Sequence, residues 1–296
     1  MAEITVELIK TLREKTNAGM MDCKAALTEA GGDLAEAETI LRKKGIADAD
    51  KKATRAAKEG AVASLIDPGA RTGVLIEVNC ETDFVAKNEN FQEFVDGLLQ
   101  HALEAPAVDS VDAVLAQKYA GDEARTVEEV VKAKVGQLGE NLVFQRYTHY
   151  AVEGNGVIAS YIHMQGKVGV LIEVNCGKAE TAANETFREL VKDITLHIAA
   201  AHPVCVARDE VPAEKVEAEK DIYRAQMAGK PDNIIEKILA GKLDKFYSTI
   251  ALLEQGFVKD PDQTIGALLE AKGKEIGDTL SVRRFTRYAL GEDADS

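Results

Sequence analysis

The chain has 296 residues, more than one hydrophobic core usually supports, so its length predicts two or more compact units. Hydrophobic residues make up 46% and charged residues 29% of the sequence, a balance that excludes a disordered chain. The formal net charge is -14, so phosphate-driven binding to bulk nucleic acid has no electrostatic source. No stretch is apolar enough for a signal peptide or a membrane span. We therefore expect a cytoplasmic protein without nucleic-acid or membrane partners.

The first 55 residues differ in kind from the rest of the chain. Three short amphipathic helices are expected there, at residues 5–16, 18–30 and 33–44. Asp33 is well placed to cap the third of them. Residues 47–58 are rich in Lys and Ala without a compact apolar face, and we interpret them as a linker.

An internal repeat organises the remainder. The sequence GVLIEVNC occurs at residues 73–80 and again, letter for letter, at residues 169–176. In the first copy, short β-branched runs and then helical spacing predict a hairpin and a helix, at residues 62–66, 74–79 and 88–103. A fainter match between residues 139–151 and 277–289 predicts a third strand that closes each copy.

The second copy contains an insertion. Its closing strand lies about 42 residues further from the preceding repeat than in the first copy. The extra residues are expected between positions 209 and 256, where apolar residues at helical spacing flank Gly229-Lys230-Pro231. Two helices joined by a tight turn form a hairpin that cannot bury both faces alone. We expect it to dock on a partner protein or on a second copy of the chain.

These patterns predict an α+β protein. A three-helix N-terminal domain with its linker occupies residues 1–55, and the two core subdomains, each a three-stranded antiparallel sheet with a helix, occupy residues 56–152 and 153–296.

Motifs for covalent chemistry are scarce. Neither GxxxxGK[ST] nor GxGxxG occurs, so we expect no nucleotide site. His202 and Cys205 could supply only two metal ligands, and no metal or other cofactor is expected. Cys80 and His101, repeated as Cys176 and His197, could be read as catalytic pairs. Their presence in both copies is more typical of core packing.

The two copies diverge in sequence directly after their nearly identical segment. Residues 81–86 read ETDFVA in the first copy, whereas residues 177–182 read GKAETA in the second. Phe84 is explained either as a side chain that fills the core, as most Phe do, or as part of a turn that presents a ring and an acid to a partner.

Two motifs in combination resemble the bacterial translation elongation factor Ts family. They are TNAGMMDCKAAL at residues 16–27, preceded by Leu12 and Arg13, and EVNCETDFVAK at residues 77–87. The resemblance covers essentially the whole chain and implies a UBA-like three-helix domain, a duplicated core and a coiled-coil hairpin. It further implies a protein that binds elongation factor Tu, a GTPase, and promotes release of its GDP without covalent chemistry. For the hairpin it implies either partner docking or contacts of a homodimer, the second of which would give a 2:2 complex.

The resemblance implies which residues touch the GTPase. The segment that wedges between helices of the GTPase domain and disturbs its Mg²⁺ site corresponds to Thr82, Asp83, Phe84 and Val85. The contact surface of the N-terminal domain corresponds to Leu12, Arg13, Met20, Met21 and Lys24. Contacts from the core correspond to Leu138 and His163, although a half-buried strand histidine is an equal alternative for His163.

Two other classes of function remain open from sequence. A structural adaptor would capture partners without altering any nucleotide, and would not need an acid and an aromatic side by side in one copy only. An enzyme using Cys80 and His101 would show thiol-dependent turnover, but no oxyanion, phosphate or metal motif accompanies them.

Overall fold

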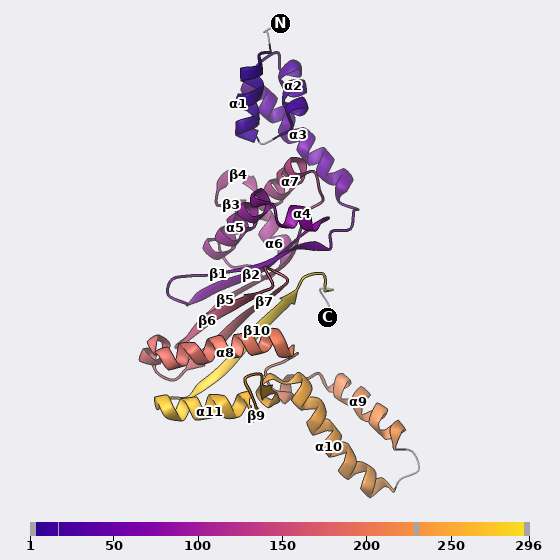
Figure 1. The fold of residues 1–296 in the computed structure, drawn as a ribbon, viewed down its shortest axis with the longest axis vertical. Coiled ribbons are helices and arrows are strands. Elements are labelled where there is room, and N and C mark those ends of the chain that lie inside the picture. Colours follow the sequence, from indigo (N-terminus) through magenta and orange to yellow (C-terminus); the bar gives the residue numbers. More distant parts are fainter. Residues whose placement is uncertain (1–3, 17, 228–230, 293–296) are drawn as a thin grey trace.

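The computed structural model describes residues 4–16, 18–227 and 231–292. The molecule is elongated, with a small helical domain at one end and a projecting helical hairpin at the other (Figure 1). The mixed content of helices and small antiparallel sheets confirms the α+β class.

Three helices form the N-terminal domain: α1 (Val6–Thr16), α2 (Met20–Glu29) and α3 (Leu34–Lys52). Asp33 caps α3 as expected, because its carboxylate accepts a hydrogen bond from the backbone N–H of Glu36 at 2.8 Å. The prediction that residues 47–58 form a linker is wrong for the first six of them, since α3 continues to Lys52. Lys and Ala are strong helix formers, and Ala49 is buried in the core of the first repeat.

The first repeat begins with β1 (Glu59–Ile66) and β2 (Thr72–Cys80), the predicted hairpin. The other elements of the repeat, in chain order, are α4 (Asp83–Ala86), α5 (Glu89–Glu104), α6 (Val111–Ala116), β3 (Lys118–Tyr119), β4 (Asp122–Thr126), α7 (Val127–Leu138) and β5 (Val143–Ala151). The sheet order is β1-β2-β5, all antiparallel, so the predicted third strand is confirmed.

The second repeat has the same plan. Its sheet consists of β6 (Gly156–His163), β7 (Val168–Cys176) and β10 (Leu280–Ala289), in the order β10-β7-β6. The elements between β7 and β10 are the 3₁₀ helix η1 (Ala179–Ala183), α8 (Glu185–Ala201), η2 (Arg208–Glu210), α9 (Ala213–Gln226), α10 (Asp232–Ile250), η3 (Leu252–Glu254), β8 (Gly256–Phe257), β9 (Asp260–Thr264) and α11 (Ile265–Ile276). The inserted helices are confirmed as α9 and α10, whereas Gly229 and Lys230 lie outside the described residues.

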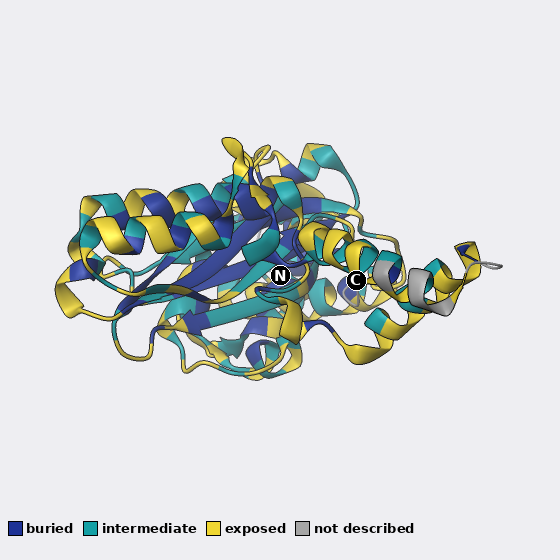
Figure 2. Cartoon of the chain, turned by 90° about the horizontal axis from the view of Figure 1, so that it is seen from below, coloured by how far each residue is buried: buried dark blue, intermediate teal, exposed yellow. Residues whose placement is uncertain are grey.

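The two sheets pack against each other, and helices cover their outer faces (Figure 1). Many of the strand residues are buried (Figure 2). Val74, Ile76 and Val78 of β2 point toward α5 and its neighbours. Leu75, between them, packs instead with Leu171 of β7 in a cluster that joins the sheets. Burial on both faces explains why the repeated segment reads as a continuous apolar run rather than as an alternation.

The sequence pattern missed one part of each repeat. A two-stranded ribbon followed by a helix, β3-β4-α7 in the first copy and β8-β9-α11 in the second, stands between the long helix and the closing strand. The ribbon strands are only two to five residues long, too short for a recognisable alternation. Within the described residues, no helix is both long and apolar enough to cross a membrane.

Candidate protein interface

The turn after β2 presents Phe84 to solvent. Its side chain is 82% exposed, which excludes the core-filling alternative for this residue. Thr82 caps the short helix α4, since its hydroxyl accepts a hydrogen bond from the Val85 backbone N–H at 3.3 Å. Val85, by contrast, packs against the core of the first repeat. The segment is therefore anchored on one side and exposes its aromatic ring on the other.

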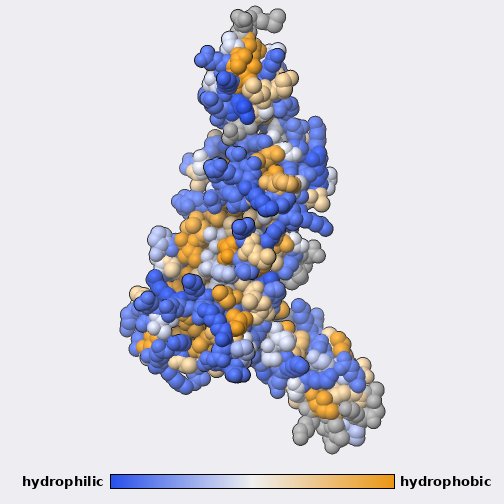
Figure 3. Space-filling model, in the orientation of Figure 1, coloured by the Kyte–Doolittle hydropathy of each residue, from blue (hydrophilic) through white to orange (hydrophobic). Residues whose placement is uncertain are grey.

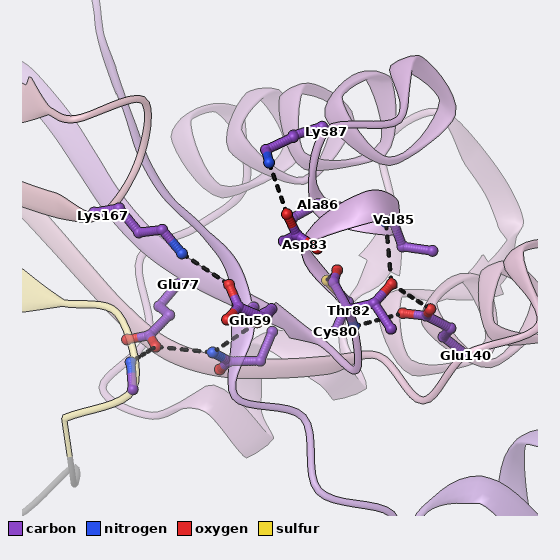
Figure 4. A network of polar contacts seen from close by, with 12 residues as sticks. Glu59, Glu77, Cys80, Thr82, Asp83, Val85, Ala86, Lys87, Glu140 and Lys167 are labelled. Atoms are coloured by element: carbon purple, nitrogen blue, oxygen red, sulfur yellow. Dashed lines mark hydrogen bonds and ion pairs between the residues drawn. The ribbon is translucent and has the colours of Figure 1, made fainter.

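Glu140, between α7 and β5, holds this turn (Figure 4). One carboxylate oxygen accepts the backbone N–H groups of Glu81 and Thr82, at 3.1 and 3.0 Å. The other accepts the Thr82 hydroxyl at 2.6 Å. Sequence reasoning did not identify Glu140, because its partners lie almost sixty residues earlier in the chain.

Charged side chains surround Asp83. The Lys87 ammonium lies 2.7 Å from its carboxylate and lowers the pKa of Asp83, with a smaller contribution from Lys167. Lys167 in turn pairs with Glu59 at 2.8 Å (Figure 4). Asp83 remains ionised near neutral pH and lines a groove of about 760 Å³ that extends between β1 and the turn that follows β6.

That turn brings Met164 to the other side of the same groove, next to His163 at the end of β6. His163 is exposed, and its ring stacks on Tyr161 with centroids 5.8 Å apart, so the half-buried alternative is excluded. Met164 is 67% exposed, has a positive φ of 50° and lines the groove together with Asp83 and Lys87. Sequence reasoning missed Met164; the only available signal was an apolar residue inside a polar turn. Leu138, at the end of α7, is partly buried against the first core.

The N-terminal domain exposes most of its predicted contact residues. Met21 is 76% and Met20 46% exposed, which is unusual for a pair of methionines, and Arg13 and Lys24 are exposed as well. Leu12 is different, because it is fully buried at the centre of the three-helix core. Its assignment as a contact residue is corrected accordingly: in this structure its side chain holds the helices together and offers no surface.

Apolar surface occurs at several levels along the long axis of the molecule, separated by hydrophilic surface (Figure 3). The described residues include no cluster of three or more His, Cys, Asp or Glu side chains that could hold a metal ion.

The cysteine and histidine pairs have structural surroundings. Burial, with the Glu140 carboxylate as a second cause, raises the pKa of the Cys80 thiol to about 12, so the thiolate needed for nucleophilic attack is scarce at neutral pH. The thiol instead donates to the Thr82 backbone oxygen at 3.2 Å. His101 is hydrogen-bonded to Gln117 at 3.0 Å, and burial lowers its pKa. These contacts argue against the hypothesis that Cys80 and His101 form a catalytic pair.

The second copy builds a similar turn with different residues. Asp278 takes the place of Glu140 and accepts the Lys178 backbone N–H at 3.0 Å and the Thr181 hydroxyl at 2.6 Å. Cys176 donates to the Lys178 oxygen, as Cys80 does to that of Thr82. However, η1 has no side-chain N-cap and carries no aromatic residue. Only the first copy therefore presents a capped helix with a ring.

Comparison with known proteins gives a consistent result. The family model described as "Elongation factor TS" matches residues 81–292. Elongation factor Ts of Trichlorobacter lovleyi is 46% identical over 292 residues, which cover 98% of this chain and 93% of the relative. Those of Nostoc sp. and Clostridium botulinum are 44% and 43% identical, cover 99% and 98% of this chain, and are themselves covered over 94% and 93% of their lengths.

Proposed function

Since this chain belongs to the elongation factor Ts family, we propose that it is a guanine nucleotide exchange factor, which binds elongation factor Tu in its GDP form and promotes release of the nucleotide. The observation that carries the proposal is Phe84, a ring 82% exposed on a turn that Thr82 caps and Glu140 holds in place. An exposed aromatic of this kind has the character of a binding hot spot. The second copy, which shares the frame, lacks it.

The proposed mechanism is differential binding rather than covalent chemistry. An exchange factor that binds the nucleotide-free GTPase more tightly than the GDP-bound form must, by thermodynamic linkage, weaken GDP binding by the same ratio. Incoming GTP then displaces the factor by the same reciprocity.

In this mechanism Phe84 and Asp83 insert between helices of the GTPase and disturb the site that holds Mg²⁺. The ion is the main counter-charge to the GDP phosphates, so its loss speeds release of the nucleotide. Asp83 enters as an anion, since the neighbouring ammonium of Lys87 lowers its pKa.

The remaining predicted residues serve to dock the GTPase. Met20 and Met21 offer adaptable apolar surface, which suits a protein contact, and Arg13 and Lys24 of the same domain expose their charges. Met164 extends the contact along the groove beside Asp83, and the exposed His163 precedes it in the chain. Leu12 contributes by holding α1 in place beneath this surface.

The test is the rate at which a fluorescent GDP analogue leaves the cognate elongation factor Tu, measured by stopped flow. Wild-type protein is expected to accelerate release, and Asp83→Ala/Phe84→Ala to lose at least about tenfold of that acceleration while it remains folded. The matched control is Glu180→Ala, because Glu180 is exposed at the position in the second copy that corresponds to Phe84. This variant should accelerate GDP release from the GTPase as strongly as the wild-type protein does.

Two outcomes contradict the proposal. If wild-type protein binds the GTPase but leaves the release rate unchanged, the adaptor function replaces it. If the control loses as much activity as the double variant, the turn in the first copy has no special role.

A further inference from the structure

The orientation of Phe84 depends on very few contacts. Helix α4 has four residues, far fewer than an isolated helix needs to be stable in water. Phe84 itself, mostly exposed, gains little from packing. What fixes the helix is therefore the packing of Val85 and Ala86 on the first core, together with the cap at Thr82.

Glu140 completes that cap. Its carboxylate accepts three hydrogen bonds from the two residues that precede Asp83, and charged acceptors make such bonds stronger than neutral ones. Because the Thr82 hydroxyl donates to Glu140, its lone pairs are oriented to accept from the Val85 N–H. A reciprocal bond, from the Asn141 N–H to the Glu81 carboxylate at 2.7 Å, ties the same two segments together.

The second copy shows what this arrangement adds. Asp278 also holds its turn, but the threonine it contacts is Thr181, inside η1 rather than at the cap position. The residue that corresponds to Thr82 is Lys178, which makes no side-chain cap. The combination of Thr82 with Glu140 is thus the part of the turn that is specific to the copy with the exposed ring.

We propose that Glu140 is a positioning residue for nucleotide exchange: it fixes α4 so that Asp83 and Phe84 are held ready to insert. This inference rests on the proposed function. A looser turn reduces the fraction of bound complexes in which the ring is correctly oriented, while docking through the N-terminal domain is unaffected. Loss of Glu140 therefore lowers the maximal rate of GDP release more than it raises the concentration needed for half-saturation.

The experiment measures GDP release as a function of factor concentration for wild type, Glu140→Ala, Glu140→Gln and Asp278→Ala. Glu140→Ala removes three charge-assisted hydrogen bonds and is expected to lower the maximal rate at least about tenfold, the effect of losing one such bond, with half-saturation changed by less than about twofold. Glu140→Gln should lower the maximal rate less, by about threefold, because its amide oxygen still accepts the two backbone N–H groups whereas its NH2 group cannot accept the hydrogen bond from the Thr82 hydroxyl. Asp278→Ala removes the equivalent carboxylate in the second copy and should leave the maximal rate unchanged.

Two further readouts separate positioning from general stability. Hydrogen exchange at the Glu81, Thr82 and Val85 amides should become faster in Glu140→Ala, while the amides of α5 keep their protection. In an Asp83→Ala/Phe84→Ala background, Glu140→Ala should cause no further loss of rate, because the two side chains that it positions are absent.

The inference is overturned if Glu140→Ala reaches the wild-type maximal rate, if Asp278→Ala loses as much rate as Glu140→Ala, or if the loss persists undiminished without Asp83 and Phe84. Failure of the proposed function is distinct, since wild-type protein would then not accelerate GDP release at all. Should Glu140→Ala fail to fold, Glu140→Gln combined with the amide exchange measurement decides the question: unchanged protection of Thr82 and Val85 and an unchanged rate would refute it.

Discussion

The two repeats have equivalent three-stranded sheets and differ in the segments outside those sheets. Ser64 donates to Ser160 at 2.9 Å, a bond between corresponding positions of the two repeats, so the pseudo-twofold axis passes between them. Reciprocal hydrogen bonds link Thr148 to Tyr288 and Tyr150 to Thr286, both at 2.6 Å. The contacts between the sheets thus occur in equivalent pairs. The differences lie outside the sheets, where a change does not have to be matched in the other copy.

Apart from the turn after the central strand, the two copies differ most in what packs on α7 and on its counterpart α11. In the first copy α3 packs on α7, and Lys132 pairs with Asp50 at 3.2 Å. A Cβ on Gly136 would lie only 3.1 Å from the Cα of Gly45, so the helices approach closely. In the second copy the corresponding positions hold Glu270 and Lys274, and a groove of about 700 Å³ lies open beside α11. The N-terminal domain thus packs on the first repeat only.

The largest expected difference in stability between equivalent substitutions in the two copies concerns their buried ion pairs. Arg146 binds Glu77 and Arg284 binds Glu173, and both glutamates are at most 3% exposed. Both arginines also donate to a backbone oxygen, Arg146 to Ala289 at 2.7 Å and Arg284 to Ala151 at 3.3 Å. The Arg146 side chain is 10% exposed, whereas that of Arg284 is 44% exposed. Arg146→Met should therefore cost about 3–5 kcal/mol of unfolding free energy. Arg284→Met should cost less, roughly 1–3 kcal/mol.

Urea denaturation of both variants checks this order, with m-values compared to confirm that the unfolding transition is the same. Equal losses would mean that solvent exposure of the arginine does not distinguish the two pairs.

A smaller effect concerns the buried histidines. Burial lowers the pKa of His101 and of His197, and each is hydrogen-bonded to a glutamine, Gln117 or Gln255, at 3.0 Å. Because the folded state binds protons less readily than the unfolded chain, this stability is present above pH ~6.5 and is lost as the pH falls below it. Each histidine contributes a slope of at most about 1.4 kcal/mol per pH unit.

Unfolding free energies between pH 7.5 and about 5.5 test the symmetry, in a range where the carboxylates remain ionised. His101→Gln and His197→Gln should each flatten the slope by a similar amount, and the double variant should flatten it most. His149, whose pKa is also lowered by burial, accounts for a residual slope. A single variant that abolished the whole slope would show that the two sites are not equivalent.

The smallest predicted effect lies on the pseudo-twofold axis itself. Ser64→Ala leaves the Ser160 hydroxyl without its partner and should cost about 1 kcal/mol. Ser160→Ala should cost the same. The double variant should cost less than the two single losses together, since neither hydroxyl then remains unpaired. Strictly additive losses in thermal or urea unfolding would refute a direct bond between the two.

Sequence patterns alone determined the duplicated frame, the three strands of each sheet, the long helix of each copy and the inserted hairpin. These follow from local signals: a repeated eight-residue segment, β-branched runs and helical spacing. Sequence also singled out the segment with Phe84, because a site that differs inside an otherwise matching repeat is visible without coordinates. The identity of the partner came from family resemblance, not from these patterns.

Only the tertiary structure decided which side chains are offered to solvent. Leu12 and Met21 are both apolar residues on amphipathic helices, yet the first is fully buried and the second is 76% exposed. The extension of α3 over α7 and the hold of Glu140 on the turn before Phe84 depend likewise on residues far apart in the chain. The physical reason is that burial and hydrogen bonding between distant segments are set by how elements pack, whereas periodicity and turn chemistry report only on near neighbours.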